Sequence, residues 1–296
     1  AVPSAEKLRL GAKSVIRQNN GYAGEDSYFV YSTNEEINDE NPISCVMGVA
    51  DGVGMWKKEG VDAGKYSRHL MHSARAAVTE ANLRSPFKIL SDAYQKTTLV
   101  DRMKGSCTAC IMALDSMNAS IEAVNIGDSG IIVIRGSSVV FRSPEQEHFF
   151  GCPYQLGHNS STLPDQAQRV YIDVEPGDVI LLASDGLFDN VSDRMIASLV
   201  SKYTSPIMFD HITGMQIPMQ HTTRKINVTE MARMLAGHAY YNSINKEKDT
   251  PWSLAASQEW DMPINGGKVD DIVVVVGYVE VIENEKSKEH EEGAPS

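Results

Sequence analysis

Carboxylates recur along this chain where apolar runs of strand length begin or end. Asp51 follows the run 43–50, and Asp185 follows the run 179–184. The other acids in such places are Glu25, Asp26, Asp128, Asp270 and Asp271. A turn after a strand needs at most one polar residue. Acids at several strand ends therefore indicate one convergent site of oxygen ligands for hard divalent cations.

Each acid that precedes a glycine also has a simpler interpretation, because Asp-Gly is a common dipeptide of tight turns. Asp51 differs from an ordinary turn because three glycines, Gly48, Gly52 and Gly54, lie around it. Asp185 differs because Asp189 follows four residues later, on the same side of a helical turn over 187–190. We therefore interpret the acids as one site rather than as separate turns.

The composition argues against two classes of function. The 296 residues carry a net charge of −12, whereas a general nucleic-acid binder needs a basic surface to neutralise phosphates. No apolar run approaches the roughly 20 residues of a membrane-spanning helix, so no membrane span is expected. The chain is long enough for one large domain or two small ones.

Four cysteines indicate a reduced, intracellular protein: Cys45, Cys107, Cys110 and Cys152. Cys107 and Cys110 form a C-x-x-C pair, but the pair leads into a predicted strand, and no second ligand pair for zinc accompanies it. Buried packing is the favoured interpretation. Mitochondrion, another organelle and cytoplasm all stay open, because a targeting segment could have been removed before Ala1.

Apolar periodicity predicts helices and strands in alternating blocks. Strands are predicted at 43–50, 107–114, 120–126, 130–135, 138–142, 169–174, 179–184 and 272–282. The strands 169–174 and 179–184 are predicted to pair around the turn 175–178. Helices are predicted over 60–82 and after Ser85, Ser192 and Asn227. Paired helices between antiparallel strand blocks favour an α+β layered domain over a doubly wound parallel sheet.

Other segments lack a regular pattern. The regions 143–168, 203–226 and 241–268 are predicted to be irregular and to lie on the surface. Residues 283–296 form a charged, non-periodic tail that is predicted to be disordered. The chain has no Gly-x-Ser-x-Gly elbow, no H-E-x-x-H zinc helix and no P-loop lysine.

Six motifs occur in the order that is typical of one enzyme family. They are Glu25-Asp26, Gly48 to Gly54, Gly105 to Ala109, Asn125 to Gly130, Ser184 to Asn190 and Asp270 to Ile272. Over about residues 11–282 the chain resembles the metal-dependent type-2C serine/threonine protein phosphatases. The stretches 49–56 and 148–156 resemble the branch that includes mitochondrial-matrix phosphatases and organellar relatives.

The resemblance implies a fold, a domain and a site. The fold is a central antiparallel β-sandwich flanked by pairs of helices, with a di-metal site at one end, in a single catalytic domain over 1–282. Asp51 would bridge two cations, and Gly52 would offer its carbonyl. The remaining implied residues are Asp185, Asp270 and Glu25 as metal ligands, Asp26 and Asp271 as their supporting partners, and Asp128 with Asp185 and Asp189 at a third site.

Two positions depart from the family's pattern. Val53 stands where a histidine commonly serves as a candidate general acid. An arginine that commonly holds phosphate shortly before Glu25 is also missing, and Arg17 is the nearest candidate for phosphate binding.

The resemblance implies hydrolysis of phosphoserine and phosphothreonine in phosphoproteins by a metal-activated water. Asp51, Asp185 and Asp270 would carry the catalytic centre, with two Mg²⁺ or Mn²⁺ ions and a possible third, because all the ligands are oxygens. The protein is expected to be a monomer. The alternatives are a catalytically silent phosphatase-like binding or regulatory module and a different two-metal hydrolase such as a nuclease, which the acidic balance disfavours.

Overall fold

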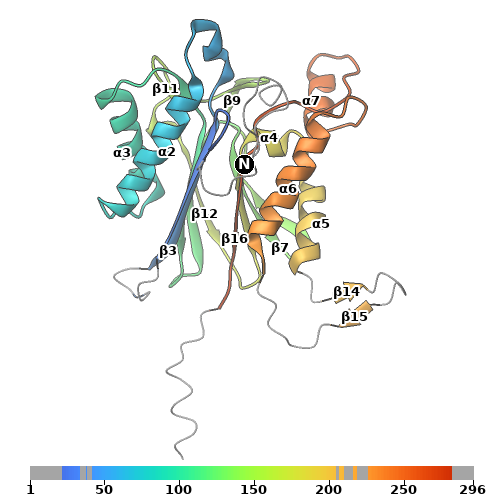
Figure 1. Cartoon of the computed structure of the whole chain (residues 1–296). Coiled ribbons are helices and arrows are strands. Elements are labelled where there is room, and N and C mark those ends of the chain that lie inside the picture. The colour runs from blue at the N-terminus through green and yellow to red at the C-terminus, as the bar shows by residue number, and fades with distance from the viewer. Residues whose placement is uncertain are drawn as a thin grey trace, which may run out of the picture.

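Two antiparallel sheets form the centre of the protein in the computed structural model, which describes residues 22–33, 38, 42–204, 207–209, 216–218 and 226–281 (Figure 1). The first sheet has the strand order β1 (Tyr22–Ala23), β2 (Asp26–Ser32), β3 (Ile43–Ala50), β5 (Ala109–Asp115), β6 (Ser120–Ile126) and β12 (Gln168–Asp173). The second has the order β16 (Val274–Tyr278), β13 (Val179–Ala183), β7 (Gly130–Arg135) and β8 (Ser138–Arg142).

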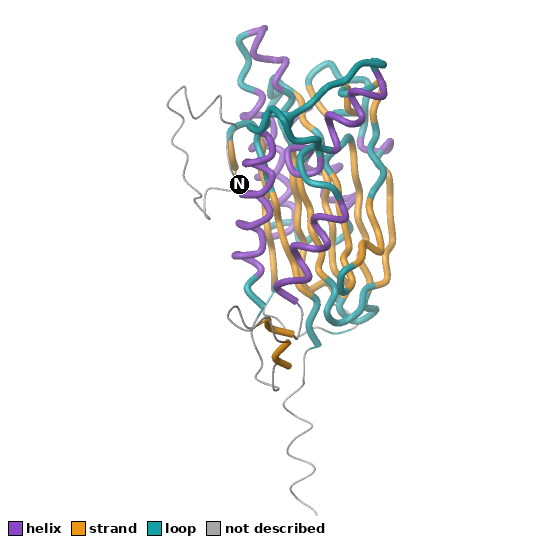
Figure 2. Tube along the Cα trace, turned by 90° about the vertical axis from the view of Figure 1, so that its right-hand side faces the viewer, coloured by secondary structure: helices purple, strands orange, loops and turns teal. Residues whose placement is uncertain are grey.

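Helices cover the outer face of each sheet. The helices α2 (Ala63–Thr79) and α3 (Pro86–Tyr94) pack on the first sheet, and α5 (Asp193–Thr204) and α6 (Val228–Ser243) pack on the second. Figure 2 views the molecule from the side of α5 and α6, with the strands behind them. The fold is therefore the predicted β-sandwich between helix pairs.

The central strands of the first sheet, β3, β5 and β6, are buried on both faces because successive side chains alternate between two apolar layers. In β3, Val46 and Ala50 pack with α2 and α3, whereas Met47 and Val49 pack against the second sheet. The predicted helix 60–82 begins at the N-cap Asp62, whose carboxylate accepts the Gly64 N–H at 3.0 Å.

The predicted pairing of 169–174 with 179–184 is wrong, because the two strands lie in different sheets. The strand β12 pairs with β6 at the edge of the first sheet, and β13 lies between β16 and β7 in the second. All residues of β13 are buried, so this strand needs an apolar layer on each face, which a hairpin at the sheet edge would not provide.

The region 241–268 is not irregular, which corrects the sequence prediction. It holds α7 (Pro251–Glu259), which starts from a capping box between Thr250 and Ser253. The region 143–168 contains short elements, which are β9 (Glu147–Phe149), β10 (Cys152–Pro153), β11 (Leu156–Gly157) and the 3₁₀ turn Pro164–Gln166, and ends at the first residue of β12. The short strands β14 (Ile207–Phe209) and β15 (Gln216–Pro218) lie in 203–226. The last strand ends at Tyr278, and residues 283–296 lie outside the described part of the chain.

The remaining elements are short: the strand β4 (Ser106–Cys107), the 3₁₀ helix Gly54–Glu59, the π-helix Gln95–Val100 and α4 (Asp185–Phe188). Cys107 and Cys110 are free and buried, which confirms the packing interpretation. Among the described helices, none combines the length and the apolar character that crossing a membrane requires.

Candidate functional site

The predicted acids meet at one end of the sandwich, where α4 lies in Figure 1. Neighbouring strands are antiparallel, so residues that precede β2 and β16 come together with residues that follow β3, β6 and β13. A cleft of about 240 Å³ is lined by Glu25, Asp51, Gly52, Asp128, Asp185 and Asp270. Both sheets therefore contribute acids to the same cleft.

The carboxylates of this cleft are poorly compensated. Burial, followed by the charges of Asp26 and Asp185, raises the pKa of Asp51 well above its ordinary value. Burial and the charge of Asp185 raise the pKa of Asp270 to about 7. Burial also raises the pKa of Asp128. These raised pKa values indicate that several carboxylates lie close together in a small buried volume, where their negative charges repel one another.

Among the acids in and beside the cleft, three buried carboxylate oxygens have no hydrogen-bond partner within the described residues: Oδ1 of Asp26, of Asp128 and of Asp185. A buried polar atom without a partner costs free energy, so such atoms call for an explanation. An oxygen-liganded divalent cation would provide it, because hard cations prefer carboxylate oxygens. The donor set therefore fits Mg²⁺ or Mn²⁺.

Asp26 and Asp271 are almost fully buried beside the cleft and hold its backbone in place. The Asp271 Oδ2 atom accepts the Glu25 N–H at 2.8 Å, and the Asp26 Oδ2 atom accepts the Ser184 hydroxyl at 2.7 Å. The contacts link the start of β2 to the residues before β16 and after β13. They agree with supporting roles for both acids.

Gly52 lies where only glycine fits. A Cβ atom at this position would stand 2.7 Å from the Glu25 carbonyl oxygen. The Asp51 carbonyl accepts the Thr108 N–H at 2.9 Å, and the Val53 N–H donates to Ser106 at 3.0 Å. Close packing of two strands therefore explains the glycine after Asp51.

The short helix α4 brings Asp185 and Asp189 to the same side, as predicted. The Asp189 N–H donates to the Asp185 carbonyl at 2.7 Å. Burial raises the pKa of Asp189 to about 7 even though Lys268 lowers it. Asp189 lines the cavity beside the cleft, together with Asp128 and Asp185.

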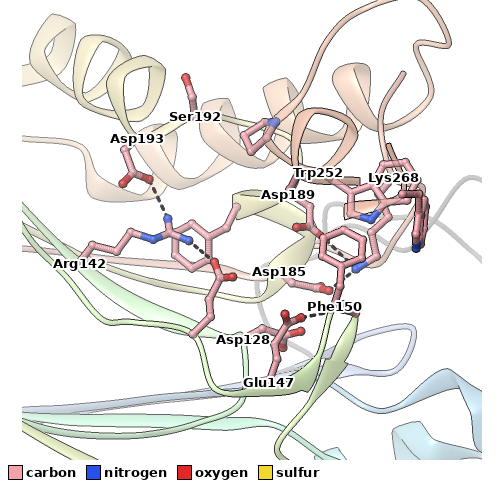
Figure 3. A pocket seen from close by; sticks show the side chains of 16 residues that line it. Asp128, Arg142, Glu147, Phe150, Asp185, Asp189, Ser192, Asp193, Trp252 and Lys268 are labelled. Carbon is pink, nitrogen blue, oxygen red and sulfur yellow. Dashed lines mark hydrogen bonds and ion pairs between the residues drawn. The ribbon is translucent and has the colours of Figure 1, made fainter. Parts of the chain in front are cut away.

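Lys268 is a site residue that the sequence interpretation missed. Its ammonium donates to Asp185 and to Asp189 Oδ2, the latter at 2.7 Å (Figure 3). It also lies 3.5 Å from Asp270 Oδ2. Burial alone would raise the pKa of Asp185, but the ammonium lowers it. Within the described residues, no three His, Cys, Asp or Glu side chains converge on one ion-sized position, and the ammonium lies among the carboxylates instead.

The loop that carries Lys268 is fastened to α4 and α6. The Asn190 side chain donates to the Lys268 carbonyl at 2.9 Å and accepts the Lys268 N–H at 3.0 Å. Asn242 donates to the Asn190 carbonyl at 2.8 Å. A Cβ at Gly267 would stand 2.1 Å from the Asn242 carbonyl oxygen, so the close approach requires glycine there.

A second lysine reaches the cleft from the 3₁₀ helix Gly54–Glu59. The Lys57 ammonium lies 3.3 Å from Glu25 Oε2, and the side chain is 58% exposed. Arg17, the candidate phosphate ligand from the sequence, lies outside the described residues. Each lysine stands within a few residues of a predicted ligand in the sequence. An isolated lysine belongs to no recognisable motif, however, so the sequence analysis did not identify either of them.

Comparison with known proteins agrees with this geometry. The family model described as Stage II sporulation protein E (SpoIIE) matches residues 43–201. A probable protein phosphatase 2C 55 of Arabidopsis thaliana is 38% identical over 260 residues, which cover 86% of this chain and 48% of that protein. The protein phosphatase PTC7 homolog fig of Drosophila willistoni is 35% identical over 274 residues, covering 88% of this chain and 79% of that protein.

Among solved structures, the photosystem II phosphatase PBCP superposes with a TM-score of 0.72 at 28% identity, covering 95% of this chain and 97% of that one. The chain belongs to the SpoIIE-type protein phosphatase 2C family. It spans about half the length of the plant relative and most of the fly relative.

Proposed function

We propose that this protein hydrolyses phosphoserine and phosphothreonine in phosphoproteins and depends on Mg²⁺ or Mn²⁺. The observation that carries the proposal is the convergence of acids from both sheets, with buried carboxylate oxygens that no described residue satisfies. Family membership supports the reaction class, and the all-oxygen donor set supports the choice of metal.

Asp51, Asp185, Asp270 and Glu25, with the Gly52 carbonyl, would hold two cations, and Asp128 and Asp189 would help to hold a third. When bound, the cations would lower the pKa of a water and neutralise charge on the phosphoryl oxygens. Asp26 and Asp271 would keep the ligands in place through the Ser184 and Glu25 contacts.

The chain's own cations would contribute to phosphate binding. Lys57 is half exposed at the rim of the cleft, so its ammonium is available to an incoming phosphate. Val53 lines the same cleft but has no proton to give, so it takes no part in general acid catalysis. The alternative of a silent binding module is disfavoured, because every proposed carboxylate ligand is retained and five of them line the cleft.

The test is hydrolysis of a phosphoserine peptide by chelator-treated protein, followed by addition of Mg²⁺ or Mn²⁺. We expect hydrolysis to stop with the chelator and to return with either metal, and phosphotyrosine peptides to react much more slowly. Full activity in excess chelator would contradict the metal-dependent reaction. A protein that binds phosphopeptide without turnover under all conditions would instead support the silent module. The family resemblance is compatible with an organellar or a cytoplasmic compartment.

A further inference from the structure

A second cavity, of about 670 Å³, adjoins the metal cleft (Figure 3). The two share four lining residues, Asp128, Gly151, Asp185 and Lys268. The larger cavity extends from these residues towards α7 and the start of α5. A group bound there would lie directly beside whatever occupies the cleft.

Aromatic rings form part of the cavity wall. Phe150 and Trp260 meet edge to face with their ring centroids 5.4 Å apart. Trp252 lines the same cavity, and its backbone N–H donates to the Asp189 carbonyl at 3.0 Å. Trp260 is 52% exposed, so a large aromatic side chain is left open to an incoming group. Such rings attract cations through their faces.

The charge of the cavity is negative. Six carboxylates line it against two cations, Arg142 and Lys268. Both cations are already engaged: Arg142 contacts Asp193 at 2.7 Å and Glu145 at 2.9 Å, and Lys268 contacts Asp185 and Asp189. Arg142 also stacks on Phe188, with its guanidinium carbon 4.0 Å from the ring centroid.

Glu147 and Asp128 are the two lining acids that no ion pair joins to a cation within the described residues, and Glu147 is the one that does not line the metal cleft. The Glu147 carboxylate accepts the Gly151 N–H at 3.0 Å. In Figure 3 the carboxylate lies below Phe150 and beside Asp128. A cationic group in the cavity would therefore meet both a ring face and an unpaired acid.

We propose that this cavity binds the side chain of an arginine or lysine that lies close to the phosphorylated residue of the substrate. The proposal rests on the phosphatase function proposed above and names the substrate class: phosphoproteins with a basic residue beside the phosphosite. An acidic side chain would face the excess of carboxylates. A purely apolar side chain would bury the Glu147 carboxylate with the Gly151 N–H but without a cation to balance its charge.

The test uses phosphoserine peptides that differ only in one residue, placed at each position up to three residues from the phosphoserine: arginine, leucine or glutamate. At the preferred position, kcat/KM should be about 5- to 30-fold higher for arginine than for leucine, and lowest for glutamate. Glu147→Gln should reduce the ratio of arginine to leucine towards one. Glu259→Gln, on α7 but outside the cavity, should leave that ratio unchanged.

A binding measurement separates this proposal from the proposed function. Calorimetric titration uses the same peptides with a non-hydrolysable phosphonate in place of the phosphate. It measures how the cavity contributes to peptide affinity, whether or not the protein hydrolyses its substrate. Tighter binding of the arginine peptide by wild type, lost in Glu147→Gln, supports the cavity. Equal binding of the arginine and leucine peptides, or preference for glutamate, overturns it. Failure to hydrolyse any peptide, with the arginine preference in binding intact, would overturn only the proposed reaction.

Discussion

The strand β13 carries a buried acid at each end, and the two ends differ in how their charge is balanced. At one end Asp178 is fully buried, and the Arg135 guanidinium donates to both its oxygens at 2.8 Å. Burial alone would raise the pKa of Asp178, but the hydrogen bonds of Arg135 and the Glu175 N–H lower it. Hydrogen bonds from the protein itself therefore satisfy both carboxylate oxygens of Asp178.

At the other end Asp185 lies among several acids that share one lysine. Lys268 contacts Asp185, Asp189 and Asp270, while Asp51 and Asp128 keep raised pKa values. We interpret the difference as one between an acid that stabilises the fold and an acid that is proposed to bind metal. The protein satisfies the acid that only stabilises the fold, and it leaves unsatisfied oxygens where a ligand would bind.

The largest effect on turnover is expected from Asp51→Asn, in the cleft at the other end of β13. Losing this charge should lower turnover of a phosphoserine peptide by at least about 10²-fold, because a cation shared by several acids would lose its central ligand. Chelator-treated Asp51→Asn should also unfold at a higher temperature than chelator-treated wild type, since one repelling charge is gone. Steady-state kinetics and thermal unfolding measure both effects. A folded variant with wild-type turnover would remove Asp51 from the site.

Asp178→Asn tests the end of β13 at which Arg135 satisfies the buried acid. The change breaks the charge-assisted bonds from Arg135 and should lower the free energy of unfolding by about 1–3 kcal/mol. Turnover per folded molecule should stay close to that of wild type, because the residue lies at the far end of β13. Chemical denaturation measures the stability, and kinetics below the unfolding range measure the turnover. Loss of turnover without loss of stability would contradict the division between the two ends.

The two ends should also respond to pH in opposite ways. Asp189 and Asp270 have ordinary pKa values of 3.8 that the fold raises to about 7. Between these values the folded state binds more protons than the unfolded state, so in chelator stability should fall as pH rises through this range. Saturating Mg²⁺ should reduce the loss. The lowered pKa of Asp178 instead removes stability as pH falls below its ordinary value of 3.8. Thermal unfolding with and without chelator measures the slopes, and identical slopes would contradict the metal assignment.

Of the two substitutions in the cleft, Asp128→Ala should have the smaller effect on turnover. This acid lines both the cleft and the larger cavity, beside Asp185, and is proposed only for the third cation. Maximal turnover should therefore change little, while the metal concentration for half-maximal turnover should rise by about tenfold. A metal titration of the kinetics measures this shift. An unchanged half-maximal concentration would remove Asp128 from the ligands.

Much of the fold was predictable because its signals are local. Apolar runs of strand length and helical periodicity located nearly every strand of the two sheets, and the strand-end acids predicted which side chains would meet. The helix α7 was missed because its pattern is short and weakly amphipathic, although Thr250 and Ser253 form a capping box. The separation of β12 from β13 depends on which apolar faces pack together, which no single stretch of sequence records.

Lys268 was missed for a related reason. Its importance comes from three carboxylates on α4 and before β16, and from the Asn190 contacts that hold its loop. Asp270 stands two residues after the lysine, but Asp185, Asp189 and Asn190 lie 78 to 83 positions before it, so the sequence around the lysine does not show them. The larger cavity likewise joins Glu147, Trp252 and Trp260 from separate regions that were predicted to be irregular.

The hydrogen bond between the Glu25 N–H and Asp271 joins residues 246 positions apart. During synthesis, residues 25, 51, 128 and 185 leave the ribosome well before residues 268–271. Until then the first sheet can pair, but its acids have neither Lys268 nor Asp271 beside them. The last strand therefore completes the site, and a chain stopped before β16 would expose an unbalanced cluster of charge instead of a binding centre.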